Sequence, residues 1–596
     1  MPSTYTPPSR IFPVAVVVPA LLSLSLVIFA HERTLVPLYG SGPTTYLLSS
    51  IVLVAMQASA LHPFHIPLNR NLLYSALTLT LAPNATYWVG VWTSRRKNPL
   101  LGPAITHAIV LGPQAFALTT FLFNTSKDSS RPRTVYRLLA TVISWQLTLS
   151  LAHQAWSQTG FLRRISDSQI YLNLACLLYI AWIASPFTTT PIQDMKKQPL
   201  TTTMTSGAKS LRLVLFAILW CLAHSRLTSP ILPHPLPEPY TLMDYPLRIL
   251  SSVQSNTGLI SVAEILPRTT QPEDPSENSD VQSVRYLRAS HSILGGVWMN
   301  DKIHVIDDEP PVTDSSGTPL GDSIYATFVL QEAVRLVNST SNQMQEGLII
   351  GLGTGISATA FQRHGLVTTI VEIDPAVYDA ARQYFGLPDP GPDRVFLEDA
   401  RAWVSRRKAE IDLTKMHTPF DFVVHDCFSG GGVPEHIYTL EFWNDTKSLL
   451  GSEGIAVVNY AGMAKSESSR MIFYTLLAAF TQCRAFHDLT DANGLSPDAY
   501  HTSFINIVIF CTNSNKPLMF RKSRKSDYLG SPLRRHVLAA LESREVNLSS
   551  ILDADDSQRY VITDKRNPLG RLQEAQGHHH WSLMREVLPD INWETY

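Results

Sequence analysis

A glycine-rich stretch is followed at a set spacing by an acid, and this combination is typical of a nucleoside-binding site. Residues 346–375 contain an apolar run, then Gly351, Gly353 and Gly355 at every second position, a second apolar run, and Glu372 near its end. Glycines let the backbone approach a ligand closely, and a carboxylate at the tip of the second strand can accept both ribose hydroxyls. We therefore expect a nucleoside-containing cofactor at this position.

The glycine spacing also discriminates between cofactors. A dinucleotide fingerprint has its third glycine one residue later, where this chain has Ile356. A second acid, Asp399, precedes Ala400 at the end of the next expected strand and is placed to accept a hydrogen bond from an adenine amino group. These features predict an adenosyl group without a pyrophosphate, whereas an ordinary structural turn is the alternative for the glycines alone.

A third acid, Asp426, follows the apolar run at 420–425 and precedes a loop with three glycines and a proline. A carboxylate there can take a proton from a nucleophilic amine or hydroxyl, steer it, or balance a positive sulfonium. A helix cap or a loop hydrogen bond is the alternative role. His436 is a possible assistant, although a lone histidine is more often structural.

The elements around these acids alternate between strand and helix, which predicts a doubly wound parallel α/β sheet of the methyltransferase-like Rossmann type. Ligands of such sheets bind beyond the carboxyl ends of the strands, where Glu372, Asp399 and Asp426 all lie. The strands are expected at 367–373, 394–397, 420–425, 454–460 and 504–511, and the helices at 356–365, 376–385, 441–450 and 471–480.

A small β-domain is expected before the sheet. Short alternating runs at 284–287, 296–299 and 302–306 predict antiparallel strands, and residues 323–337 have helical spacing. Residues 229–280 are expected to form a linker because they combine a proline-rich start with a polar, acidic loop.

The first 228 residues predict an integral, multi-pass membrane bundle. Residues 11–30 carry no charge and are long enough to cross a bilayer, and charged residues make up only 16% of the chain. Lysine and arginine clusters fall in consecutive loops, so charge bias does not decide the orientation. We expect six or seven spans, with the catalytic domain on the cytosolic side, where the cofactor is made. Further spans are expected near 44–62, 72–93, 103–124, 137–156, 169–186 and 211–224.

Several classes of function are disfavoured by composition. The net charge of −1 gives no general attraction to nucleic acid, so no nucleic-acid partner is expected. The five cysteines have no metal-ligand spacing and no paired framework, which predicts free thiols in a reducing compartment. Adjacent histidines such as His578, His579 and His580 cannot all face one ion, so we expect a surface or packing role for them and no metal site.

Residues 280–511 resemble the spermidine/spermine synthase (polyamine aminopropyltransferase) family, which has the S-adenosylmethionine-dependent methyltransferase fold. The resemblance implies S-adenosylmethionine or its decarboxylated form as cofactor and a small-molecule acceptor. It places the cofactor on Gly351, Gly353, Gly355, Glu372, Asp399 and Ala400, catalysis on Asp426, and the acceptor beside Asp322, Tyr325 and Ser429.

Two departures from the family pattern concern the acceptor. Ser429 stands where the family has a second aspartate, and Ala326 and Thr327 stand where histidine or glutamine and then glutamate follow the tyrosine. The resemblance therefore implies a membrane-fused methyltransferase, whose acceptor could be lipophilic and arrive from the bilayer. The alternatives are an aminopropyltransferase using decarboxylated cofactor, and a non-catalytic nucleoside-sensing scaffold or transporter. The sequence is compatible with an oligomer.

The expected domains are thus a membrane bundle, a linker, a small β-domain with its lead-in helix, a cofactor-binding Rossmann-like domain and a helical extension. They span 1–228, 229–280, 281–345, 346–515 and 516–596 respectively.

Overall fold

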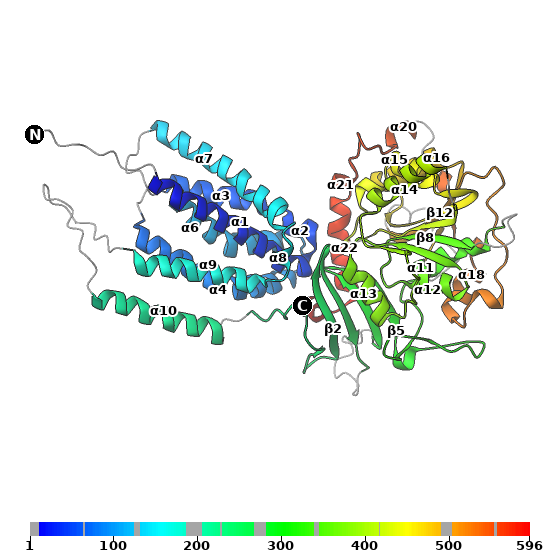
Figure 1. The fold of residues 1–596 in the computed structure, drawn as a ribbon, viewed down its shortest axis with the longest axis horizontal. Helices are drawn as coiled ribbons and strands as arrows, with labels where there is room; N and C mark the ends of the chain where they lie inside the picture. The colour runs from blue at the N-terminus through cyan, green and yellow to red at the C-terminus, as the bar shows by residue number, and fades with distance from the viewer. Residues whose placement is uncertain are drawn as a thin grey trace, which may run out of the picture. The chain divides into compact units, whose positions relative to one another are not determined.

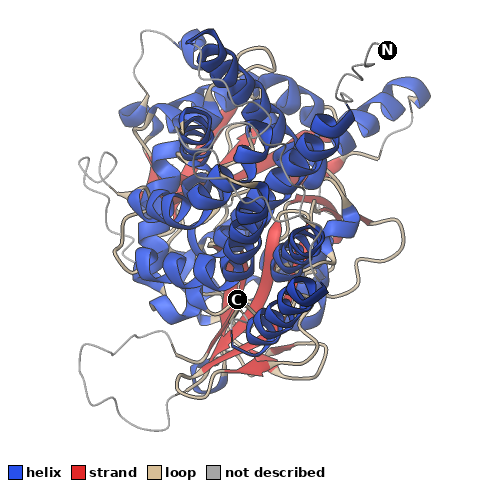
Figure 2. Cartoon of the chain, turned by 90° about the vertical axis from the view of Figure 1, so that its left-hand side faces the viewer, coloured by secondary structure: helices blue, strands red, loops and turns tan. Residues whose placement is uncertain are grey.

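The protein divides into two compact units. The structure is a computed structural model that describes residues 11–62, 66–123, 131–185, 206–226, 229–267, 282–338, 345–415, 418–428, 430–489, 503–552 and 557–596. The first unit comprises Met1–His234 together with Trp593–Tyr596, and the second comprises Pro235–Asn592. The described residues of the first unit form helices, drawn in blue in Figure 2, and all the described strands, in red, belong to the second unit.

Five helical stretches of the first unit are long and apolar enough, by length and composition, to cross a membrane. They are Val16–Tyr39, Ser41–Leu61, Leu101–Phe123, Thr134–Trp156 and Asp167–Ala184. Helices α4 (Leu68–Ser94) and α10 (Ser206–Arg226) have similar lengths but are not among these five stretches. The expected number of six or seven spans therefore stays a prediction.

The surface of this unit is apolar. Tyr136 and Ile143 of α7 (Arg131–Ser150) are both 71% exposed, and Leu177 of α9 (Asp167–Ala184) is 63% exposed. Soluble proteins rarely expose large apolar side chains in such numbers. Lipid tails would cover these side chains in a membrane.

Some polar side chains inside the first unit connect different helices. The rings of His31 and His107 lie 2.9 Å apart, Nε2 to Nδ1, and His107 Nε2 is 2.9 Å from the carbonyl oxygen of Thr44. Arg33 forms an ion pair with Asp167. Such pairs join helices where water is scarce.

The second unit begins with a five-stranded antiparallel sheet. Its strands are β1 (Tyr240–Thr241), β2 (Leu247–Ser255), β3 (Gly258–Ile265), β4 (Val284–Ala289) and β5 (Ser292–Trp298), paired in chain order.

The predicted linker at 229–280 is therefore wrong for its middle part, because three of these strands lie there. Residues 247–265 alternate apolar and polar side chains around a tight turn at 256–257, a hairpin signal that the neighbouring prolines obscured. The strand expected at 302–306 is also wrong: a short 3-10 helix, Asn300–Lys302, is followed by irregular backbone.

An eight-stranded sheet forms the centre of the unit and has the order β10-β9-β8-β11-β12-β14-β13-β15. The first five of these strands are parallel, as predicted, whereas β14, β13 and β15 pair antiparallel. The strands are β8 (Glu346–Ile350), β9 (Val367–Val371), β10 (Val395–Phe396), β11 (Phe420–His425), β12 (Leu450–Met463), β13 (Gln482–His487), β14 (Phe504–Thr512) and β15 (Glu545–Val546).

Helices cover both faces of this sheet (Figure 1). One face packs against α14 (Ala400–Thr414), α15 (Leu440–Lys447) and α16 (Glu467–Ala479), with Trp403, Trp443 and Ile472 in the core. The other packs against α11 (Thr327–Gln331), α12 (Ile356–Arg363) and α18 (Pro532–Ala539). The α/β architecture expected from the sequence is thereby confirmed for the second unit.

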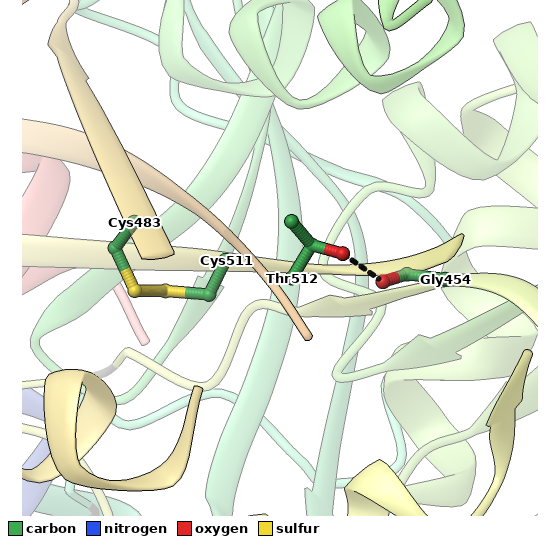
Figure 3. Close-up of a disulfide and its surroundings, with 4 residues drawn as sticks. All are labelled: Gly454, Cys483, Cys511 and Thr512. Atoms are coloured by element: carbon green, nitrogen blue, oxygen red, sulfur yellow. Dashed lines mark hydrogen bonds between the residues drawn. A yellow bond between two sulfur atoms is a disulfide. The ribbon is translucent and has the colours of Figure 1, made fainter. Parts of the chain in front are cut away.

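A disulfide joins two neighbouring strands of the sheet. Cys483 of β13 and Cys511 of β14 lie directly opposite each other and are bonded (Figure 3). The adjacent Thr512 hydroxyl donates a 3.0 Å hydrogen bond to the Gly454 carbonyl. The expectation of five free thiols is wrong for this pair, because strand pairing brings together cysteines that are 28 positions apart; Cys176, Cys221 and Cys427 are free.

Candidate functional site

The glycine loop connects β8 to α12 and has a backbone that requires glycine. Gly351, Gly353 and Gly355 have φ values of 80°, 54° and 74°, in the left-handed region. A Cβ on Gly351 would lie 2.1 Å from the carbonyl oxygen of Asp426, and one on Gly353 would lie 2.7 Å from that of Leu294 in β5. The loop is therefore packed tightly between the end of β11 and the five-stranded sheet.

One polar atom in this loop has no partner among the described residues. The Thr354 hydroxyl is 1% exposed and makes no hydrogen bond there. An unpaired buried hydroxyl is costly, so it needs an explanation. The side chain packs against β5, since a Cβ on Gly295 would lie 2.5 Å from this hydroxyl.

Glu372 follows β9 and turns its carboxylate toward the same loop. Its Oε2 accepts a 2.8 Å hydrogen bond from the backbone N–H of Leu352, and Oε1 accepts one of 2.9 Å from that of Asp374. Burial raises the pKa of Glu372 to about 7, against the opposing effect of these two donors. Each oxygen keeps a lone pair, so the carboxylate fits the ribose hydroxyls expected from the sequence.

Asp399 lies at the start of α14 and serves as its N-cap. Its Oδ1 accepts a 3.0 Å hydrogen bond from the backbone N–H of Ala402, and Oδ2 lies 2.8 Å from His436 Nε2. Ala400 is the first residue of this helix and is buried. The adenine contact expected for Asp399 and Ala400 stays a prediction, and His436 is a partner of Asp399.

Asp426 follows β11, and two amide side chains hold its carboxylate. Asn459 Nδ2 donates to Oδ1 at 2.8 Å, and Gln331 Nε2 donates to Oδ2 at 2.7 Å. The Thr327 hydroxyl in turn donates to Asn459 Oδ1 at 2.9 Å. Burial raises the pKa of Asp426, while the two amide donors oppose that shift. A fixed carboxylate with a raised pKa suits a general base.

Two of the residues expected beside the acceptor, Asp322 and Tyr325, have different neighbours. Asp322 accepts a 3.0 Å hydrogen bond from the backbone N–H of Leu533 at the start of α18, so its carboxylate anchors a helix. Tyr325 lies near Asp488, whose charge adds to the effect of burial in raising the tyrosine pKa. Ser429 lies outside the described residues.

Another acid, Asp488, lies near Tyr325. Asn506 Nδ2 donates to it at 2.8 Å, and burial raises its pKa to about 6. It follows β13, a strand that the sequence did not predict. The local signal for this strand is weak, because only Cys483 and Ala485 alternate with polar residues before Phe486.

The C-terminal helix α22 (Glu574–Val587) packs against the loop that follows Asp426. The Gln573 side chain accepts a hydrogen bond from the Val433 backbone N–H at 2.7 Å and donates to the Val433 carbonyl at 3.2 Å. The His580 ring lies 5.7 Å from that of Phe428, and burial lowers its pKa to about 4. This contact agrees with the packing role expected for His580, and no group of three potential metal ligands occurs among the described residues.

The two amides that hold Asp426 were not predicted from the sequence. Gln331 is followed by Glu332, which is the glutamine–glutamate pair that the family pattern has after its tyrosine. Here the pair follows Leu330, so the signal was displaced from Tyr325 by five positions. Asn459 has no local signature, because it lies within β12 and reaches Asp426 only through sheet pairing.

Comparisons with known proteins identify the same region. The model of the spermine/spermidine synthase domain matches residues 328–482. The chain is 38% identical over 229 residues to the polyamine aminopropyltransferase of Vibrio vulnificus, covering 38% of this chain and 69% of that protein.

A second similarity is longer. The chain is 35% identical over 361 residues to the N-terminal histidine N-methyltransferase of Emericella nidulans, and the match covers 58% of each protein. The chain thus spans less than two thirds of this relative.

Among solved structures, a spermidine synthase in complex with the transition-state analogue AdoDATO is 15% identical, with a TM-score of 0.31. The match covers 51% of this chain and 88% of the spermidine synthase chain. So low a score adds nothing to the fold assignment, which rests on the strand order.

The aminopropyltransferase similarity spans most of its relative, and the domain match contains the glycine loop, Glu372 and Asp426. The chain therefore belongs to the spermidine/spermine synthase family of S-adenosylmethionine-dependent transferases.

Proposed function

We propose that this protein is a membrane-anchored methyltransferase that uses S-adenosylmethionine to methylate a nitrogen of an N-terminal histidine. The observation that carries the proposal is the 361-residue similarity, at 35% identity, to a protein named for that reaction. The acceptor would then be the N-terminus of a protein or peptide, which replaces the lipophilic small molecule considered from the sequence alone.

The described residues fit the cofactor. The glycine loop offers backbone at close range, and Glu372 offers acceptors for ribose hydroxyls. Asp399 and Ala400 are proposed to contact the adenine. S-adenosylmethionine supplies, when bound, a methyl group on a positively charged sulfur.

Asp426 is proposed to accept the proton that the histidine loses as its nitrogen gains the methyl group. Histidine has an α-amino nitrogen and two ring nitrogens, and a carboxylate base suits both kinds of acceptor. Gln331 and Asn459 fix the orientation of the carboxylate, so that it need not reorganise during transfer. The two amides are therefore positioning residues for Asp426.

Aminopropyl transfer from decarboxylated cofactor is the second candidate, favoured by the 38% identity to a polyamine aminopropyltransferase. The acceptor side argues against it. Ser429 replaces the family's second aspartate, and Leu330 precedes the Gln331-Glu332 pair where the family has a tyrosine. A cationic diamine would therefore lose two of its expected partners. The relatives are transferases, so a non-catalytic scaffold has no support from them.

We further propose that the second unit lies in an oxidising compartment, on the side of the membrane away from the cytosol. The Cys483–Cys511 disulfide supports this location, because disulfides form and persist in secretory and extracellular compartments. This proposal replaces the cytosolic location expected from the sequence. Proteins that pass through the same compartment would be the natural acceptors.

The test uses the full chain in detergent with S-adenosylmethionine and a synthetic peptide that begins with histidine. Mass spectrometry should find one added methyl group on this peptide and none on the same peptide beginning with alanine. Fragmentation then assigns the α-amino or a ring nitrogen. The proposal fails if the histidine peptide stays unmodified while putrescine and decarboxylated cofactor give an aminopropyl product.

A further inference from the structure

We propose that the second unit is N-glycosylated at Asn444 and Asn547. Each asparagine begins an acceptor sequence of the form Asn-X-Ser/Thr, where X is not proline. The sequences are Asn444-Asp445-Thr446 and Asn547-Leu548-Ser549. The inference rests on the oxidising location proposed above, and it goes beyond the transferase activity.

Asn444 lies on the outer face of α15. Phe442, Trp443 and Thr446 of this helix are buried, whereas Asn444 is exposed. Its side-chain amide makes no hydrogen bond to any residue that the structure describes. A glycan attached there would extend into solvent without displacing a protein contact.

Asn547 is also exposed, at the start of the short helix α19 (Leu548–Ile551). Its side-chain oxygen accepts hydrogen bonds from the backbone N–H of Ser549 at 3.1 Å and from the Ser549 hydroxyl at 2.7 Å. Glycosylation modifies the amide nitrogen and leaves this oxygen in place. The helix cap therefore survives the modification.

Both asparagines must lie on the same side of the membrane as the disulfide. Among the described residues, the five candidate spans all end at or before Ala184, and none falls within the second unit. The chain between Asn444 and Asn547 includes Cys483 and Cys511. A compartment that oxidises this cysteine pair is also one in which secretory proteins receive glycans.

The modification needs one co-reactant, a lipid-linked oligosaccharide pyrophosphate. A bond forms between the asparagine amide nitrogen and the first carbon of the sugar, the bond from that carbon to the pyrophosphate breaks, and the nitrogen loses one proton. The lipid pyrophosphate is the leaving group, and no oxidant or reductant is required.

The other three acceptor sequences do not carry the proposal. The two residues after Asn338 lie outside the described residues, as does Asn124. Asn84 lies within α4 of the first unit and is half-buried. Asn84 thus provides an internal control, because a position inside a helical bundle should stay unmodified.

The experiment expresses the full chain in a eukaryotic secretory host and treats the membrane fraction with an endoglycosidase. The expected result is a glycosidase-sensitive mobility shift to which each glycan contributes. The shift should decrease in Asn444→Gln and in Asn547→Gln, and it should be absent in the double variant. Asn84→Gln should leave the shift unchanged. Peptide mass spectrometry of the unmodified chain, deglycosylated in heavy-oxygen water, identifies the modified asparagines without relying on any variant.

A chain with no glycosidase-sensitive shift would overturn the proposal, as would glycans found only at asparagines other than Asn444 and Asn547. Methyl transfer to the histidine peptide, measured on the same preparations, is independent of this result. An active but unglycosylated protein would therefore reject the glycosylation sites and leave the proposed activity standing.

Discussion

Asp426 is the residue on which the proposed chemistry depends. Its two oxygens are each held by a different amide, and it lies directly beside the glycine loop. Burial raises the pKa of Asp426, while the two amide donors stabilise the charged carboxylate and oppose that shift. Replacing the carboxylate by a neutral isostere separates this role from cofactor binding.

We expect Asp426→Asn to reduce kcat by about 100-fold or more, the range typical of a lost general base. Cofactor affinity should change little, because the expected cofactor contacts lie on Glu372 and the glycine loop. Single-turnover kinetics and calorimetry measure the two quantities. Asp412→Asn, an exposed change on α14, is the matched control. A parallel loss of cofactor affinity would contradict the assignment.

Glu372 should make cofactor binding depend on pH. Its pKa of about 7 lies above the ordinary 4.5, so burial favours the protonated form of the ligand-free protein. The protonated group therefore contributes to folding stability. This contribution is complete below about pH 4.5 and is lost as the pH rises through about 7. Ribose hydroxyls donate best to the ionised carboxylate, so cofactor affinity should rise with pH up to about 7.

Calorimetry between pH 5.5 and 8.5 tests this dependence, with an expected slope of at most about tenfold per pH unit for one proton. Glu372→Gln should bind the cofactor more weakly and with a flat pH profile below about 7. An unchanged slope in the variant would mean that another group is responsible.

The acids of the candidate site can be predicted from the sequence, whereas their hydrogen-bond partners cannot. Glu372, Asp399 and Asp426 each follow a recognisable apolar strand, so their placement at one sheet edge could be inferred. Gln331 lies 95 positions from Asp426 and belongs to a helix, and this separation hides the contact from any local pattern.

At the scale of elements, the glycine loop is confined by the five-stranded sheet. Leu294 of β5 approaches Gly353 so closely that no side chain fits between them. The small β-domain therefore shapes the cofactor site directly. This contact joins segments that the sequence suggested only as neighbouring domains.

We expect Gly353→Ala to abolish measurable cofactor binding, because the new methyl group would collide with the Leu294 carbonyl. Gly365→Ala is a matched control: φ is +81° there, but a Cβ has no atom within 4 Å. Alanine in the left-handed backbone conformation should lower the free energy of unfolding by about 1–2 kcal/mol in each variant. Thermal melting should show the control destabilised by that amount. Equal cofactor affinity in the two variants would rule out the proposed packing role.

The disulfide should stabilise the antiparallel side of the eight-stranded sheet. Closing a loop between cysteines 28 positions apart restricts the unfolded chain by roughly 3–4 kcal/mol on the entropic model. Cys483→Ser should therefore lower the melting temperature, and a reducing agent should do the same to the unmodified protein. Cys221→Ser, which removes a free thiol, should change neither. Equal melting of the serine variant and the unmodified protein would exclude the bond.

Elements were predicted well where strand and helix alternate and poorly where strands pair with distant partners. The strand at 420–425 has the expected bounds, whereas β13 was missed and β2 and β3 were assigned to a linker. These strands are stabilised by antiparallel pairing with distant partners. Short alternating runs near prolines do not predict that pairing.

At the scale of the whole molecule, the chain combines a soluble-type α/β unit with a helical unit whose surface is apolar. Tyr136, Ile143 and Leu177 would face water if the first unit were not in a membrane. Transferring such side chains to lipid is strongly favourable. The sequence predicted this division because charged residues are scarce only in the first part of the chain.

We expect the full chain to remain in the membrane pellet after alkaline carbonate extraction and to require detergent for release. Peripheral proteins, which are held by charge, are released by the same treatment. Centrifugation and immunoblotting provide the measurement. Recovery of the protein in the carbonate supernatant would show that the helical unit does not cross the membrane.

The eight-stranded sheet ends on each side in a strand of two residues, β10 and β15. A long, flat border would offer a row of open backbone groups to a neighbouring molecule and invite aggregation, whereas two residues offer almost none. Crowded copies of this protein should therefore not merge their sheets into a continuous ribbon. Self-association through the two outer strands of this sheet is therefore disfavoured.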